Sequence, residues 1–72
     1  MTLDDQLSAL APLDSSGGGV IARLAGYATG PVQLRKYRER GSIIPDDRLE
    51  VIAQRLEILA GIARSLKRAV EN

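Results

Sequence analysis

The chain has 72 residues, a formal net charge of +1, and neither cysteine nor histidine. A chain this short forms one domain, here residues 1–72, and buries only about 60% of the surface that it exposes when unfolded. Disulfides and zinc sites built from cysteine or histidine are excluded, and we predict no metal and no cofactor. Without the commonest general base and the best nucleophile, the chain is not expected to be an enzyme.

The first predicted helix begins after Thr2, because Asp5 follows three residues later in the pattern of a capping box. Leucines then repeat at helical spacing until Pro12. Residues 14–19, DSSGGG, come next. Their composition favours a turn over an anion-binding nest, and they lack the lysine and the preceding strand of a phosphate loop.

A short second helix is predicted from the apolar residues that follow, with Arg23 on its polar side. These residues are Val20, Ile21, Leu24 and Ala25. Gly26 stands directly after them, where the end of a helix favours a residue able to adopt positive φ. A chain reversal is therefore expected at this glycine.

The third predicted helix covers residues 31–40 and begins with a proline, with Thr29 or Gly30 as its cap. Leu34 and Tyr37 are three residues apart and form its expected buried edge. Tyr37 is assigned to the core, although its hydroxyl could also reach a ligand.

Residues 42–45 form a connector to a fourth helix, and its two isoleucines, Ile43 and Ile44, are expected in the core. Asp46 and Asp47 occupy its first turn, where carboxylates complement the helix dipole, and the helix continues to about Val70. We find no alternating pattern and no β-branched run that would predict a strand. The predicted fold is all-α, with the N-terminal helices in residues 1–45 and one long helix in residues 46–70.

The second and third helices carry a known pattern. Ala22 precedes Gly26 by four positions, as a small residue and a glycine do in helix-turn-helix regulators of the phage-repressor and Cro type. The segment LRKYRERGSIIP resembles the recognition helix and following loop of those repressors. It is also similar to the mercury-resistance-regulator type, with its Leu-Arg-x-Tyr helix and Gly-x-Ile-Pro connector, but the aromatic tail of that type is absent.

This resemblance covers roughly residues 20–60 and implies a regulator that reads DNA with its third helix. A repressor or accessory factor of a phage or mobile element would suit the chain's size. The turn after Gly26 is about two residues longer than in those regulators if Leu34 is the first buried residue of the recognition helix. Placing Val32 there restores the spacing but puts Arg35 at an apolar position, so we favour the longer turn.

Four of the ten basic residues lie in residues 31–40. Gln33, Lys36 and Arg40 are expected opposite the buried edge, with Arg35 and Arg38 flanking them. Gln33, Arg35 and Lys36 are predicted to read bases, and phosphate contacts are assigned to Arg23, Arg38 and Arg40. The alternative is a solvated basic helix. The predicted DNA-contacting residues are Arg23, Thr29, Gln33, Arg35, Lys36, Arg38 and Arg40, with Thr29 as either a cap or a phosphate ligand.

Apolar residues of the fourth helix repeat at steps of three and four, which is typical of a coiled coil. They are Leu49, Ile52, Leu56, Leu59, Ala63, Leu66 and Val70. The first half can pack on its own chain, but the second half extends past so small a domain and predicts a homodimer. The predicted interface consists of Leu56, Leu59, Ile62, Ala63, Leu66 and Val70. The alternative is a helix that folds back onto its own monomer.

Arg64, Lys67 and Arg68 complement the dipole of this helix or contact DNA or an acidic partner. The predicted function is a dimeric, sequence-specific DNA-binding transcription regulator whose partner is double-stranded DNA. The alternative is an interaction module, such as an antirepressor or adaptor, that binds a second protein through the fourth helix. No apolar run approaches a membrane span and the N-terminus is acidic, so we expect a cytoplasmic protein without a membrane partner.

Overall fold

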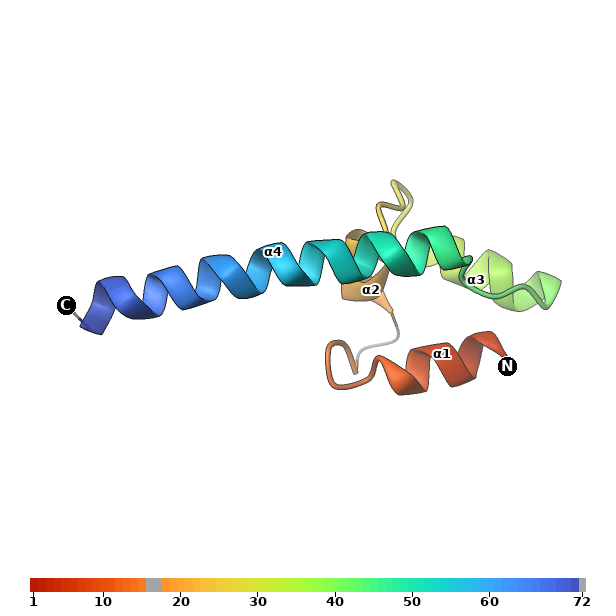
Figure 1. Ribbon diagram of the computed structural model, residues 1–72. Coiled ribbons are helices and arrows are strands. Elements are labelled where there is room, and N and C mark those ends of the chain that lie inside the picture. The colour runs from red at the N-terminus through yellow and green to blue at the C-terminus, as the bar shows by residue number, and fades with distance from the viewer. Residues whose placement is uncertain (16–17, 72) are drawn as a thin grey trace.

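The computed structural model describes the backbone of residues 1–15 and 18–71, and the side chains of residues 1–15 and 18–67. Its helices are α1 (Leu3–Ala9), α2 (Gly19–Leu24), α3 (Pro31–Arg40) and α4 (Asp46–Glu71). The described residues include no strand, so the all-α prediction is confirmed. In Figure 1, α2 lies between α1 and α4, α3 lies beside the start of α4, and the second half of α4 projects away from the other helices.

All four helices and the connector after α3 supply the apolar core. Its buried residues are Leu3, Ile21, Ala22, Ala25, Leu34, Ile44 and Ile52. The two tyrosines pack against this core from its edge. The prediction that both connector isoleucines enter the core is right for Ile44 but wrong for Ile43, which remains 41% exposed. Neighbouring residues of an extended connector point in opposite directions, so only one of the two can face inward.

The capping box of α1 is confirmed. The Thr2 hydroxyl accepts from the backbone N–H of Asp5 at 3.2 Å, and the Asp5 carboxylate accepts from the backbone N–H of Thr2 at 2.9 Å. These hydrogen bonds favour the ionised carboxylate and hold the pKa of Asp5 below its usual value. The stabilisation is therefore present at neutral pH and is lost as the pH falls through this lowered pKa. α1 ends at Ala9, three residues before Pro12.

Gln6 ties α1 to the connector after α3. Its side chain is only 5% exposed. The amide nitrogen donates to the backbone carbonyl of Ile44 at 3.1 Å, and the amide oxygen accepts from the backbone N–H of Ile44 at 2.8 Å. One glutamine thus satisfies both backbone groups of a buried residue that no helix supports.

Asp14 caps α2 from the preceding loop. Its buried carboxylate accepts from the backbone N–H of Val20 at 2.7 Å and of Ile21 at 3.3 Å. This carboxylate takes the place that an external anion would need at the start of α2. Part of the predicted 14–19 turn, residues 16 and 17, lies outside the described residues.

α4 has 26 residues and is about 39 Å long, so it accounts for most of the 51 Å length of the molecule. Leu56 is half-buried against its own core, as expected for the first half of this helix. Beyond it, Ala63 is exposed, and so are the large apolar residues Ile58, Leu59, Ile62 and Leu66. The side chain of Val70 lies outside the described residues. None of the described helices is long and apolar enough to cross a membrane.

Candidate nucleic-acid interface

The end of α2 forms the reversal that the alanine and glycine spacing predicts. Gly26 has a φ of +83°, its N–H donates to the carbonyl of Arg23 at 3.0 Å, and the N–H of Tyr27 donates to the carbonyl of Ala22 at 3.0 Å. This is a Schellman motif, which ends a helix through a residue in the left-handed region. Ala22 and Ala25 are fully buried, so α2 and its neighbours approach closely at these small side chains.

The turn continues to Gly30, whose N–H donates to the carbonyl of Tyr27 at 3.1 Å. α3 then begins with Pro31, as predicted, and Gly30 is its N-terminal cap residue. Thr29 is exposed, and α3 has no side-chain cap, so the prediction of Thr29 as a cap is wrong. Gly30, with a φ of +64°, directs the chain into the helix without a side-chain oxygen. The choice of Leu34 over Val32 as the first buried residue of α3 is confirmed, since Leu34 is buried and Val32 is exposed.

Two arginines of α4 hold the reversal in place. Arg48 donates to the carbonyl of Ala25 at 3.0 Å, and Arg55 donates to the carbonyls of Arg23 and Leu24 at 2.8 and 3.0 Å. These carbonyls lie in the last turn and C-cap of α2, where no further turn of helix follows, and cations complement the negative end of a helix dipole. Neither arginine was assigned a role from the sequence.

The two tyrosines connect the turn to α3. Their rings meet edge to face with centroids 5.8 Å apart, and the Tyr37 hydroxyl donates to the Tyr27 hydroxyl at 3.1 Å. The guanidinium of Arg48 lies 5.5 Å from the centroid of the Tyr27 ring. Burial raises the pKa of Tyr27 above its usual value, so this hydroxyl stays protonated at neutral pH. The core assignment of Tyr37 agrees with these contacts.

Replacing Gly26 with valine is expected to lower the free energy of unfolding by at least about 1 kcal/mol. A side chain strains the φ of +83°, and a Cβ atom would lie 3.3 Å from the guanidinium of Arg48. Thermal unfolding followed by circular dichroism measures the change. Gly61→Ala is the control, because nothing lies within 4 Å of its Cβ position. This control should match or exceed the wild-type melting temperature, since alanine favours a helix more than glycine does. Equal melting of Gly26→Val and wild type would contradict the role of the glycine.

The outer face of α3 differs from the prediction, because neither Gln33 nor Arg40 lies on it. Residues in a helix are about 100° apart, so Val32, Arg35, Lys36 and Glu39 share an arc of about 100° opposite the buried edge. All four are exposed. Gln33 is half-buried instead, because it lies only about 40° from Tyr37 on the helix surface. The expectation that Gln33 faces outward, opposite the buried edge, is therefore wrong, and an acidic residue occupies the middle of that face.

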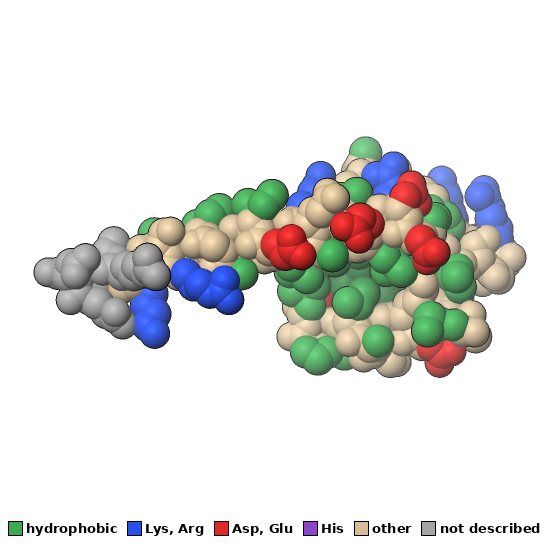
Figure 2. All heavy atoms as spheres, in the orientation of Figure 1, with side chains coloured by type: hydrophobic (Ala, Val, Ile, Leu, Met, Phe, Trp, Pro, Cys, Tyr) green, Lys and Arg blue, Asp and Glu red, His purple; other side chains and the backbone are tan. Residues whose placement is uncertain are grey.

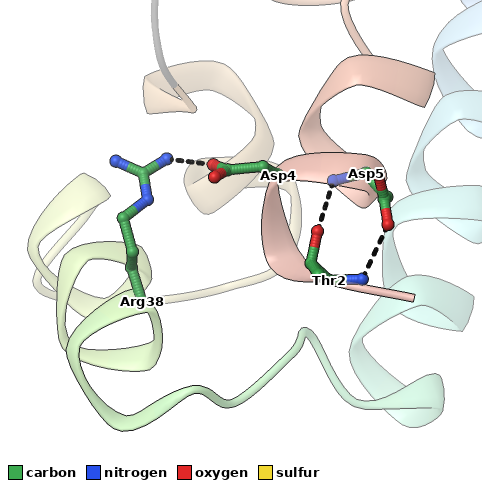
Figure 3. A network of polar contacts seen from close by, with 4 residues as sticks. All are labelled: Thr2, Asp4, Asp5 and Arg38. Atoms are coloured by element: carbon green, nitrogen blue, oxygen red, sulfur yellow. Dashed lines mark hydrogen bonds and ion pairs between the residues drawn. The ribbon is translucent and has the colours of Figure 1, made fainter.

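The remaining predicted residues surround this face or lie apart from it. Arg40 is exposed in the last turn of α3, and Arg23 is exposed on α2. Arg38 forms an ion pair with Asp4 of α1, with a guanidinium nitrogen 2.7 Å from a carboxylate oxygen (Figure 3). The two side chains are 58% and 72% exposed, so the pair contributes at most about 1 kcal/mol to stability. A phosphate competing for Arg38 would have to replace Asp4.

Among the described residues, no group of three or more acidic side chains is placed to hold a metal ion. Comparisons with protein-family models, curated proteins and solved structures found no match to this chain. The outer face of α3 and the projecting half of α4 are therefore interpreted from their own geometry and charge.

Proposed function

We propose that the protein is a sequence-specific DNA-binding transcription regulator that places α3 in the major groove. The observation that carries the proposal is the pair of exposed cations, Arg35 and Lys36, on the face of α3 turned away from the core. α2, the turn and the two α4 arginines hold the helix behind that face, as a rigid scaffold must do for base recognition.

The exposed side chains on the outer face of α3 match groups in the major groove. Arg35 and Lys36 pair with guanine, and the exposed Val32 contacts a thymine methyl group. Glu39 accepts from a cytosine amino group or repels phosphates, which adds discrimination. The side chains beside the outer face contact the sugar-phosphate backbone and set the register. These are Gln33, Arg38 and Arg40, with Arg23 of α2 as a further phosphate contact.

The ion pair between Asp4 and Arg38 predicts an unusual effect of removing a carboxylate. Asp4→Asn is expected to raise the affinity for duplex DNA about threefold to tenfold at low salt, because it frees Arg38 and removes a charge that repels phosphate. The melting temperature should change little, since exposed pairs contribute little to stability. Fluorescence anisotropy with labelled duplexes measures the affinity.

Glu57→Gln is the matched control for Asp4→Asn, because it removes the same charge from an exposed position on α4. Its effect on affinity should be clearly smaller than that of Asp4→Asn. A weaker affinity of Asp4→Asn than of wild type would contradict the competition and show that Asp4 positions Arg38 for DNA.

The exposed apolar residues of α4 favour a second candidate function, a protein-interaction module such as an antirepressor or adaptor. The two functions differ in their response to salt. Binding through phosphates weakens steeply as salt rises, whereas binding through apolar side chains does not. A salt titration of binding to duplex DNA therefore tests the proposed function directly.

A further inference from the structure

The projecting half of α4 carries an apolar stripe, defined here as Ile58, Leu59, Ile62 and Leu66. These side chains are 50–62% exposed. Leu59 and Leu66 continue the face of α4 that packs on the core through Ile52 and Leu56, and Ile58 and Ile62 widen the stripe on one side. The globular half of the molecule is defined here as α1, α2, α3 and the first half of α4. In Figure 2, hydrophobic and basic side chains follow the projecting half, whereas acidic side chains gather over the globular half. Monomeric proteins rarely leave such a stripe uncovered.

We propose that a second copy of the chain covers the stripe, with the two α4 helices antiparallel and a two-fold axis at Ile62. Facing residue numbers then sum to twice 62, or 124, so Ile58 lies opposite Leu66 of the second copy. Ile62 faces its own copy, and Leu59 faces Ser65, so most of the stripe pairs with itself, as an interface with two-fold symmetry requires.

The position of the globular half favours this direction over a parallel one. In a parallel pair, equal residue numbers lie side by side. In residues 46–57, the same side of α4 already packs on the chain's own core, through Ile52 and Leu56. Two parallel helices would have to diverge at Leu56. Antiparallel helices avoid this conflict, because the two globular halves lie at opposite ends of the pair.

The charges of α4 near the stripe lie on the other side of the helix. Residues 58–67 contain Arg64 and Lys67 and no acidic residue, and Glu57 is the last acidic residue before them. Because residues in a helix are about 100° apart, these three side chains lie about 130° to 170° from the middle of the stripe. Within residues 58–67, the face that the second copy covers therefore carries no charged residue, and the position of the globular half alone sets the direction.

The resulting spacing suits the proposed function, on which this step rests. With a rise of about 1.5 Å per residue, the two copies of Ile52 are about 30 Å apart along the pair, and the two copies of Arg48 about 42 Å. This range includes the 34–36 Å between half-sites one DNA turn apart. Parallel pairing would instead place the two globular halves, each 20–21 Å wide, side by side, with their centres only about one such width apart.

Distance measurement by pulsed electron paramagnetic resonance tests the arrangement without DNA. The chain has no cysteine, so Glu50→Cys and Ser65→Cys each accept one nitroxide label per copy. The antiparallel pair predicts about 36 Å along the axis between labels at position 50, and less than about 20 Å between labels at position 65. Adding Ile62→Asp to the Glu50→Cys variant should abolish the distance signal and leave the helical circular dichroism spectrum intact.

Short distances at both positions would overturn the proposal in favour of parallel helices. Absence of any distance at high protein concentration would also overturn it and indicate that a different protein covers the stripe. Because no DNA is present, this result is independent of the proposed function. An antiparallel pair that fails to bind DNA would remove that function and keep the dimer.

Discussion

Replacing Gln6 with leucine is expected to lower the free energy of unfolding by about 2 to 4 kcal/mol. The leucine fits a similar volume but leaves the N–H and carbonyl of Ile44 buried without a partner. A buried polar group without a hydrogen bond costs about 1 to 3 kcal/mol. A chain of this size has only about 4 to 11 kcal/mol of total stability, so this is among the largest single effects available to it.

Thermal and urea unfolding of Gln6→Leu measure the loss, which corresponds to a fall in melting temperature of about 10 °C or more. Gln54→Ala is the control, because its amide lies on the exposed side of α4, 3.5 Å from Glu50. Its stability should stay within about 0.5 kcal/mol of wild type. Equal stability of Gln6→Leu and wild type would show that α1 is not held to the connector by this side chain.

Replacing both Arg35 and Lys36 with alanine is expected to weaken specific DNA binding at least about 30-fold. A direct base contact contributes about 1 to 3 kcal/mol, and 1.4 kcal/mol corresponds to a factor of ten in affinity. Removing both base-reading side chains therefore costs at least about 2 kcal/mol of binding free energy. The fold should persist, because both side chains are exposed and alanine favours a helix. Anisotropy titration and circular dichroism measure the two quantities.

The matched control for Arg35→Ala/Lys36→Ala is Arg64→Ala/Lys67→Ala, which removes the same two charges from the projecting half of α4. Its binding should stay within a few-fold of wild type. Equal losses in the two double variants would mean that net charge alone governs binding and that α3 is not the reading helix.

Much of the fold could be predicted because its signals are local. The capping box of Thr2 and Asp5, the proline at the start of α3 and the positive φ of Gly26 follow from residues a few positions apart. The buried edge of α3 was also predicted, because Leu34 and Tyr37 share a helix face and only apolar or amphipathic side chains suit a core.

The contacts between distant segments could not be predicted. Gln6 and Ile44 are 38 positions apart, and Arg55 and Arg23 are 32 apart. A glutamine at the sixth position and an arginine in a long helix resemble ordinary surface residues until the packing of the helices is known. Gln33 shows a related limit. Leu34 and Tyr37 define the inner side of α3, but a residue about 40° from Tyr37 lies at the boundary rather than outside.

The ion pair of Asp4 and Arg38 is a further contact that the charge pattern alone does not reveal. The basic residues of α3 were assigned to DNA as a group, yet α1 brings a carboxylate to one of them. Charge counts along a helix therefore overestimate the number of cations that face a ligand.

The measurement that tests the central claim most directly is an anisotropy titration of the intact protein with duplex DNA over a series of salt concentrations. A randomised duplex is compared with the DNA that flanks the protein's own gene. If Arg23, Arg38 and Arg40 each neutralise one phosphate in both copies of a dimer, the logarithm of the affinity falls with that of the salt concentration with a slope of about −5. We predict this slope and a preference for the flanking DNA. No binding at low salt, or binding that salt does not weaken, would contradict the assignment of α3 as a DNA-reading helix.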